Sequence, residues 1–202
     1  MKLYFSPGAC SLSPHIALLE AGLDFTTEKV DIRARKTESG ADFLAINPKG
    51  YVPALELKDG AVLTEGPAIV QFIADLVPDR ELAPANGTLE RYRLVEWLNF
   101  ISTEIHKSFS PLFRPTSTED MKEAARTHLT NRLGWLASQL EGKDYLMGSQ
   151  FTVADGYLFT VLGWANFVKF DLSAWPVFAA YTQRVASRPA VQQALRDEGL
   201  LK

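Results

Sequence analysis

The stretch that decides the fold of this chain is SPGACSLSPH, residues 6–15. It follows a short apolar strand predicted over residues 2–5 and leads directly into a predicted helix. Gly8 allows the tight reversal between these two elements, because glycine adopts backbone conformations that other residues avoid. Ser11 or Ser13 is suited to cap the helix with its hydroxyl. The pattern therefore predicts a strand-to-helix turn.

Cys10, the only cysteine of the chain, lies in this turn. Backbone N–H groups and the positive end of a helix dipole favour a thiolate there, which lowers the pKa of the thiol. The alternative is an inert buried cysteine, which is common for a lone one. Ser13 stands where a Cys-x-x-Cys pair would have its second cysteine. Any disulfide of Cys10 therefore involves another molecule.

The bulk composition narrows the class of protein. The chain has 202 residues, 47% of them apolar, which is enough for one large domain or two small ones. The net charge is −3 with both signs interspersed, so we expect no nucleic-acid partner. Three scattered histidines and one cysteine predict no metal site. No long apolar run or leader pattern is present, so we expect a soluble, cytoplasmic protein without a membrane partner.

The first part of the chain alternates between strand and helix patterns. Asp-Gly between two apolar runs is a strong hairpin signal, and Pro67 suits the first turn of a helix. The predicted order is β-α-β-α-β-β-α, with a mixed four-stranded sheet. The strands are expected over 2–5, 26–30, 54–57 and 61–63, and the helices over 16–21, 41–46 and 67–76.

The second part of the chain is predicted to be entirely helical. Prolines and an Asn-Gly pair mark a connecting segment. We therefore expect a first domain over 1–80, a linker over 81–87 and an all-helical domain over 88–202. Apolar spacing of three and four residues predicts helices over 88–113, 118–140, 152–168, 175–187 and 189–198. The third of these begins with a capping box, in which Asp155 replaces the usual Glu or Gln.

Two further turns carry candidate binding groups. If the Val52–Pro53 bond is cis, the backbone of Val52 is turned outward beside the sheet edge and can pair with an extended peptide. An ordinary trans X-Pro turn is the alternative. At the second turn, Glu65 can bind an ammonium group, while the N–H of Gly66 can hold a carboxylate at the helix start. Alternatively, Glu65 only complements the helix dipole.

Compact polar side chains share one face of the helix predicted over 88–113. They recur at spacings of four, three and four residues, as Asn99, Thr103, His106 and Ser110. A different face carries Leu98, Ile101, Ile105 and Phe109. A solvated face usually carries Lys and Glu, so the polar face suits the wall of a half-buried cleft. The alternative for His106 is an ordinary surface histidine.

These pieces together resemble the bacterial Beta class of glutathione transferases over the whole chain. The runs that carry the resemblance are residues 6–15, Asn47-Pro48-Lys49-Gly50-Tyr51-Val52-Pro53, Leu63-Thr64-Glu65-Gly66, Thr103-Glu104-Ile105-His106-Lys107, the capping box from Thr152 and the terminal Glu198-Gly199-Leu200. Cys10 together with His106 is specific to this class.

The resemblance implies a thioredoxin-like N-terminal domain, an all-helical C-terminal domain, and a cytoplasmic homodimer with glutathione bound between the domains. Val52 would pair with the cysteinyl backbone of glutathione beside a cis Pro53. The residues expected to bind glutathione are Ala9, Cys10, Arg35, Val52, Pro53, Glu65, Gly66, Asn99, Thr103, His106 and Lys107, with Cys10 and His106 catalytic. Phe109, Phe113 and Trp164 are expected to line the site of a hydrophobic co-substrate.

Two positions depart from the pattern of relatives. Gly66 stands where many members of the wider superfamily have Ser, so it can donate only its backbone N–H. Arg35 stands where several Beta-class members have Lys; it keeps the charge for the glycine carboxylate of glutathione but has a different reach.

The implied activity is conjugation of the glutathione thiolate to small hydrophobic electrophiles, in detoxification or xenobiotic degradation. Glutathione would be a co-substrate, and no tightly bound cofactor is expected. One alternative is a glutathione-dependent thiol transferase or reductive dehalogenase that acts through a mixed disulfide at Cys10. A second is a non-catalytic binding protein of the same fold.

Overall fold

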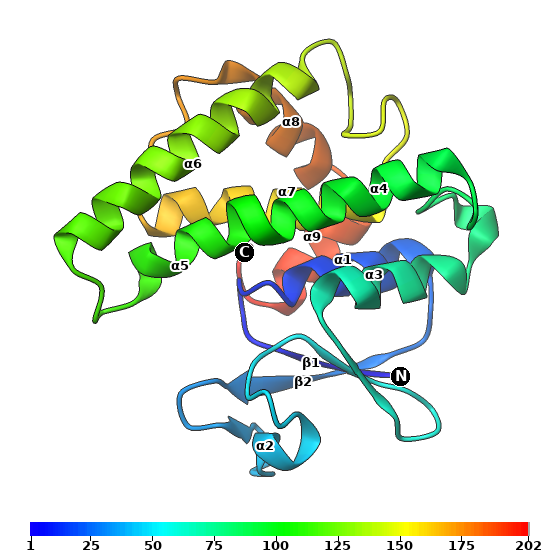
Figure 1. The fold of residues 1–202 in the computed structure, drawn as a ribbon. Helices are drawn as coiled ribbons and strands as arrows, with labels where there is room; N and C mark the ends of the chain where they lie inside the picture. Colours follow the sequence, from blue (N-terminus) through cyan, green and yellow to red (C-terminus); the bar gives the residue numbers. More distant parts are fainter. Residues whose placement is uncertain (202) are drawn as a thin grey trace. The chain divides into compact units, whose positions relative to one another are not determined.

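The computed structural model of the protein describes residues 1–201, and its contacts divide the chain into two compact units (Figure 1). The N-terminal unit consists of Met1–Ala83 together with the C-terminal segment from Ser187, and the helical unit is Pro84–Ala186. The division predicted from the sequence kept all of 88–202 in one domain. The difference arises because the last helix packs against the first helix of the chain.

A five-stranded sheet with the order β3-β2-β1-β4-β5 forms the centre of the N-terminal unit. β1 pairs in parallel with β2, and the other neighbours are antiparallel. The sequence predicted four strands; the fifth is a two-residue strand that carries no alternating pattern. The strands are β1 (Lys2–Phe5), β2 (Thr26–Asp31), β3 (Lys36–Thr37), β4 (Ala54–Glu56) and β5 (Val62–Thr64).

Helices pack on both faces of this sheet (Figure 1). Because side chains alternate along a strand, Tyr4 faces a buried cluster with Phe43 of α2, while Leu3 points to the opposite face. On that opposite face, α1 packs against both α3 and α9. The helices are α1 (Leu12–Ala21), α2 (Phe43–Ile46), α3 (Gly66–Asp75), the short helix η1 (Pro78–Arg80) and α9 (Pro189–Asp197).

The helical unit contains the long segments that the apolar spacing predicted. The segment expected as one helix over 88–113 is continuous but changes its winding, with a π-helical stretch between two α-helical ones. Within residues 1–201, no helix combines the length and apolar character needed to cross a membrane. The elements are α4 (Leu89–Phe100), η2 (Ile101–His106), α5 (Lys107–Phe113), α6 (Glu119–Leu140), α7 (Val153–Phe167) and α8 (Pro176–Ala186).

The buried helix α7 begins with the predicted capping box, and Asp155 is its centre. The carboxylate accepts hydrogen bonds from the N–H and hydroxyl of Thr152, both at 2.9 Å, and from the N–H of Leu146 at 2.8 Å. The hydroxyl of Tyr181, on α8, donates a further one at 2.8 Å. Burial raises the pKa of Asp155, and these hydrogen bonds oppose the rise. Asp155 thus joins α7, α8 and the preceding loop.

Candidate functional site

The turn that carries Cys10 is held by its own backbone and by Ser11. The N–H of Ala9 donates to the carbonyl of Ser6 at 3.0 Å, and Gly8 has φ +70°, as the predicted reversal requires. We expected Ser11 or Ser13 to cap α1, but neither hydroxyl does so. The hydroxyl of Ser11 accepts from the N–H of Ser6 at 3.1 Å instead, so it closes the loop rather than the helix.

Cys10 lies beside Val52. The half-buried thiol is placed to donate to the carbonyl of Val52, with Sγ and O 3.3 Å apart. The Val52–Pro53 peptide bond is cis, which the sequence left open. The amide of Asn47 holds the preceding carbonyl, that of Tyr51, at 2.7 Å. The sulfur and a backbone able to bind an extended peptide are therefore neighbours.

A buried carboxylate near the C-terminus also holds the Cys10 turn. Glu198 Oε2 accepts from the N–H of Gly8 at 2.9 Å, and its Oε1 lies 3.0 Å from Nδ1 of His15 on α1. The side chains of Glu198 and His15 are 0% and 1% exposed. This link joins residues 190 positions apart in the sequence, and no local pattern predicted it.

Glu65 occupies the strand-to-helix turn before α3 with φ +69°, a conformation unusual for a residue other than glycine. Its Oε1 accepts from the ammonium of Lys49 at 2.6 Å and from the hydroxyl of Tyr51 at 2.8 Å. The hydrogen bond to Glu65 is the main cause that raises the pKa of Tyr51 and of Lys49. The carboxylate at this exposed turn thus binds the ammonium group of Lys49, and the predicted binding of a ligand's ammonium group there stays a prediction. Lys49 and Tyr51 were not singled out from the sequence.

The remaining candidates on the N-terminal unit lie close to the same backbone. A Cβ on Gly66, the first residue of α3, would be 3.9 Å from the ring of Pro53. Arg35 is exposed and has φ +54°, and a Cβ on Gly50 would lie 3.4 Å from its Nη1. The loop before Val52 therefore has a guanidinium beside it. Ala9 packs against the cluster that contains Val52.

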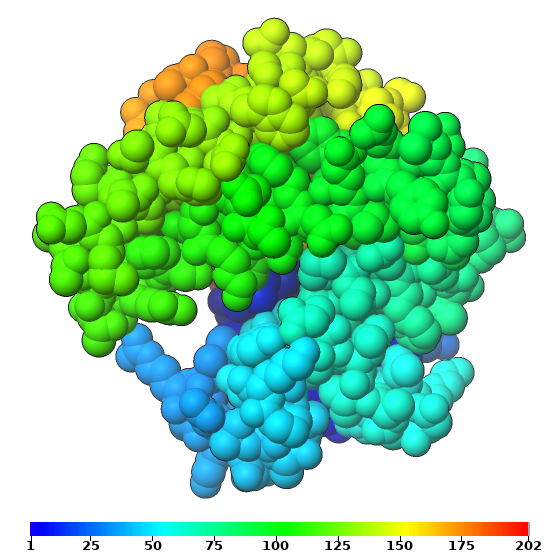
Figure 2. Space-filling model, in the orientation of Figure 1, coloured from blue at the N-terminus to red at the C-terminus, as the bar shows by residue number. Residues whose placement is uncertain are grey.

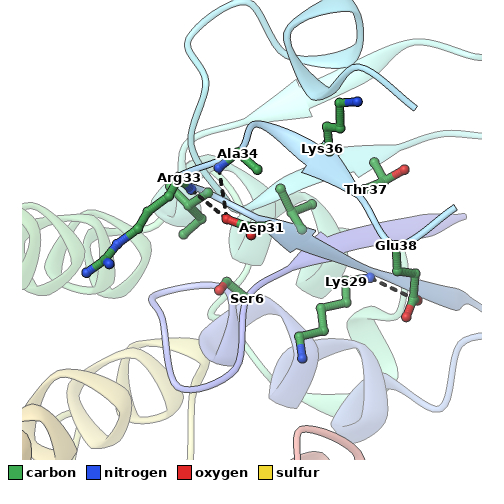
Figure 3. Close-up of a pocket in the computed structure, with 10 residues that line it drawn as sticks. Ser6, Lys29, Asp31, Arg33, Ala34, Lys36, Thr37 and Glu38 are labelled. Carbon is green, nitrogen blue, oxygen red and sulfur yellow. Dashed lines mark hydrogen bonds between the residues drawn. The ribbon is translucent and has the colours of Figure 1, made fainter. Parts of the chain in front are cut away.

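A shallow cavity of about 750 Å³ opens on the N-terminal unit beside β2 and β3 (Figure 3). Its walls carry the cations Lys29, Arg33 and Lys36. The carboxylate of Asp31 accepts from the N–H groups of Arg33 and Ala34, both at 2.9 Å, so its role there is to close a turn. The cavity shares Ser6 with the Cys10 turn, but none of the predicted binding residues lines it.

In the helical unit, two of the four residues of the predicted polar face, Thr103 and His106, lie in the π-helical stretch η2, while Asn99 lies in α4 and Ser110 in α5. The hydroxyl of Thr103 donates to the carbonyl of Asn99, and the amide of Asn99 donates to the carbonyl of Val95, each at 3.0 Å. Each of these two exposed side chains thus donates a hydrogen bond to a backbone carbonyl of its own helix. π-Helical turns are rare and frequently mark functional sites.

His106 is the last residue of η2 and contacts α7 through two aromatic side chains. Its Nδ1 lies 2.7 Å from the hydroxyl of Tyr157, and its ring meets that of Trp164 edge to face at 4.6 Å between centroids. His106 is half-buried, and its Nδ1 has a hydrogen-bond partner in Tyr157. Lys107, the next residue, is exposed and lines a small apolar depression between α5 and α6.

The predicted walls of a co-substrate site differ in exposure. Phe109 is fully buried and packs against Trp164 and Phe170 at centroid distances of 6.0 and 6.4 Å. Phe109 thus belongs to the core of the helical unit, and its expected place in the lining of a co-substrate site stays a prediction. Phe113 is 47% exposed and meets Trp164 at 5.8 Å, while Trp164 is 7% exposed.

Comparisons with known proteins agree with this geometry in both units. Residues 8–76 match the model of the glutathione S-transferase N-terminal domain, and residues 100–189 match that of the C-terminal domain. The chain is 50% identical to glutathione S-transferase GstA of Escherichia coli O157:H7, over 99% of this chain and 100% of that protein. The chain belongs to the glutathione S-transferase family.

Similar solved structures place this transferase in the Beta class. One is a ternary complex of BphK, a bacterial glutathione transferase, with 62% identity, a TM-score of 0.98 and coverage of 99% and 100% of the two chains. A second is the Beta-class glutathione transferase of Sphingomonas chungbukensis, with 54% identity, a TM-score of 0.97 and full coverage of both chains. A third is a sphingomonad glutathione transferase complexed with glutathione, with 52% identity, a TM-score of 0.96 and coverage of 99% and 100%.

The protein is thus an enzyme with glutathione as its co-substrate. In this glutathione transferase the structure brings Cys10, Val52 and Pro53 together, and it places Glu65 with Lys49 and Tyr51. Sequence reasoning missed the side chains that hold the candidates in place, above all Tyr157 and Glu198. Both are distant in sequence from the residues they contact, so only the fold could reveal them.

Proposed function

We propose that this glutathione transferase conjugates the glutathione thiolate to small hydrophobic electrophiles, in detoxification or xenobiotic degradation. The tripeptide would pair its cysteinyl backbone with Val52. Its γ-glutamyl ammonium would bind Glu65, and the γ-glutamyl carboxylate would bind the N–H of Gly66 at the start of α3. The guanidinium of Arg35 beside Gly50 would receive the glycine carboxylate.

The observation that carries this proposal is the contact between the Cys10 sulfur and the Val52 carbonyl. It supports the proposal because the thiol of Cys10 is next to the backbone that would hold the peptide. Each tenfold gain in thiolate over thiol requires about 1.4 kcal/mol. The amide groups of the Cys10 turn and the dipole of α1 are of the right sign to supply part of it. On the helical unit, Asn99, Thr103, His106 and Lys107 are the proposed neighbours of the sulfur.

The proposed reaction is a nucleophilic substitution or addition. The sulfur of glutathione gives up its proton to water and attacks an electrophilic carbon; a carbon–sulfur bond forms, and a halide leaves with the bonding electron pair. For an unsaturated substrate, the electrons move onto the acceptor instead, which then takes a proton. Phe113, exposed beside Trp164, is the proposed contact of the co-substrate.

Glutathione binding and conjugation test the proposal with two matched variants. Glu65→Gln removes the charge that would hold the γ-glutamyl ammonium, so KM for glutathione should rise at least about tenfold. Glu119→Gln breaks a similar exposed Glu–Lys pair on the helical unit, with Lys122 at 2.7 Å, and should leave KM unchanged. Calorimetry should detect heat when glutathione is added to the unmodified protein. No heat, together with no turnover of a chloronitroarene, would contradict the proposal.

A second candidate function rests on the thiol of Cys10 itself. A half-buried cysteine beside a peptide-binding backbone can attack the glutathionyl sulfur of a mixed disulfide between glutathione and a small thiol. The bond to the small thiol breaks, and that thiol leaves as a thiolate while Cys10 becomes disulfide-bonded to glutathione. A glutathione thiolate then attacks this disulfide, which regenerates Cys10 and releases glutathione disulfide. Cys10→Ala should abolish this exchange while conjugation falls only in part. Loss of both activities would instead make Cys10 essential for conjugation.

We also propose a cytoplasmic homodimer, as is general for the family. The reducing cytoplasm keeps a lone thiol such as Cys10 reduced. Figure 2 shows α4, α5 and α6 on one face of the helical unit. Leu89 and Tyr92 of α4 are 66% and 65% exposed. Such exposed apolar side chains suit burial against a second copy. Light scattering during size-exclusion chromatography should give twice the chain mass, and Tyr92→Glu should lower it.

A further inference from the structure

The imidazole of His106 is fixed by two side chains of one helix. Tyr157 and Trp164 are seven residues apart on α7, so they lie on the same face two turns apart. Trp164 meets the His106 ring edge to face, with 81° between the planes, and Tyr157 lies 2.7 Å from Nδ1. Both aromatic side chains are buried, and α7 itself is anchored by Asp155. The imidazole of His106 is therefore held by two buried side chains of an anchored helix.

The short distance indicates which atom donates. A separation of 2.7 Å is usual when a hydroxyl donates, whereas N–H donors favour about 2.9–3.0 Å. This distance favours the arrangement in which the hydroxyl of Tyr157 donates to Nδ1 of a neutral imidazole. A neutral imidazole carries only one ring proton, so accepting at Nδ1 places that proton on Nε2.

We propose that Tyr157 is a positioning residue that keeps His106 in the tautomer with its proton on Nε2. In that tautomer the imidazole presents a hydrogen-bond donor, which an anionic sulfur requires. The opposite tautomer would present a lone pair and repel the anion. The inference deepens the proposed function and rests on it for the role of the donor, but the tautomer itself is a property of the protein alone.

The tautomer can be measured directly by long-range ¹H–¹⁵N NMR of the ring nitrogens. The chain has only three histidines, and His15→Gln and His128→Gln variants assign the other two. At a pH where His106 is neutral, its spectrum should show a protonated Nε2 and a bare Nδ1. Tyr157→Phe keeps the ring and removes the hydroxyl, so a mixture of tautomers should appear. A proton on Nδ1 in the unmodified protein, or an unchanged pattern in Tyr157→Phe, would overturn the proposal.

A matched variant separates positioning from general loss of stability. Tyr181→Phe removes another buried hydroxyl of the same unit, the one that donates to Asp155. It should lower the unfolding temperature without changing the His106 spectrum. Should Tyr157→Phe fail to fold, the spectrum of the unmodified protein still decides the tautomer.

Kinetics then test the consequence for the reaction. Tyr157→Phe should lower kcat about three- to tenfold and move the acidic limb of the pH–rate profile to higher pH, with KM for glutathione unchanged. Tyr181→Phe should leave the limb in place. A limb that does not move in Tyr157→Phe would overturn the positioning role. If the unmodified protein had no conjugating activity, the proposed function would be refuted. The tautomer measured by NMR would still be valid, because that measurement does not depend on activity.

Discussion

The two units of this glutathione transferase hold their candidate site residues by different means. In the N-terminal unit the candidates lie on turns, whose backbone includes a cis Pro53 and the positive φ of Gly8 and Glu65. The carboxylate of Glu65 then pairs with the ammonium of Lys49. In the helical unit they lie on one continuous helical segment that includes the π-helical stretch η2, and His106 contacts buried aromatic side chains of α7. Site residues on a turn can therefore be predicted from neighbouring residues in the sequence. The orientation of a side chain on a helix face depends instead on residues that are distant in the sequence.

The largest expected effect tests whether packing around α7 supports the helical unit. Asp155→Ala removes the acceptor of hydrogen bonds from Leu146, Thr152 and Tyr181, which are left buried without it. Stability should fall by about 4 kcal/mol, since each orphaned buried donor costs about 1–3 kcal/mol and part of the loss is relieved by relaxation. Urea unfolding followed by tryptophan fluorescence measures the change.

Asp171→Ala is the matched control for that experiment. Asp171 is an exposed carboxylate of the same unit that accepts from Ser173. Its loss should cost less than about 1 kcal/mol. Equal losses in the two variants would mean that the buried network does not hold α7.

The sequence predicts turns better than it predicts contacts between helices. The turn at 6–15 and the hairpin were predictable because glycine and proline mark them in the sequence. β3 was missed because Lys36–Thr37 is too short for an alternating pattern. The π-helical stretch was missed because Ile101, Ile105 and Phe109, spaced by four, fit an α-helix equally well. The contact of His106 with Tyr157 spans 51 residues, which no local pattern encodes.

The second prediction separates packing from binding on the helical unit. Phe109→Ala empties a fully buried site and should cost about 3–5 kcal/mol of stability. Phe113→Ala removes an exposed ring and should cost less than about 1 kcal/mol, while KM for a hydrophobic electrophile rises. Unfolding curves and conjugation kinetics of both variants decide this. A large stability loss in Phe113→Ala would erase the distinction between the two rings.

A smaller loss of stability is expected from Glu198, which is distant in sequence from the Cys10 turn that it holds. Glu198→Gln keeps the shape of the side chain but removes its charge, so the bonds to Gly8 and His15 weaken. Stability should fall by about 2 kcal/mol, since hydrogen bonds to charged groups are the stronger ones. Cys10, the only thiol, should react several-fold faster with an aromatic disulfide reagent because its turn is less firmly held.

The exposed Glu123→Gln serves as the control for Glu198→Gln and should change neither the stability nor the thiol rate. Faster reaction of Cys10 in both variants would point to charge alone. An unchanged rate in Glu198→Gln would show that the turn is held by its own backbone, as the comparison of the two units first suggests.

The smallest effect concerns surface charge in the N-terminal unit. Hydrogen bonds, first from Ser39 and then from others including Lys2, lower the pKa of Glu28. A lowered pKa means that the folded state favours the carboxylate, so the stabilisation is present above the ordinary pKa of the side chain. It is lost as the pH falls through the lower, folded-state pKa. Because the Lys2–Glu28 ion pair lies near the surface, its contribution to the free energy of unfolding at neutral pH should be at most about 0.5 kcal/mol. Urea unfolding should show this difference between the unmodified protein and Glu28→Gln at pH 7 and a smaller one at pH 3. A difference of the same size at pH 3 would assign the effect to packing, and charged contacts would then matter less to this unit than backbone turns do.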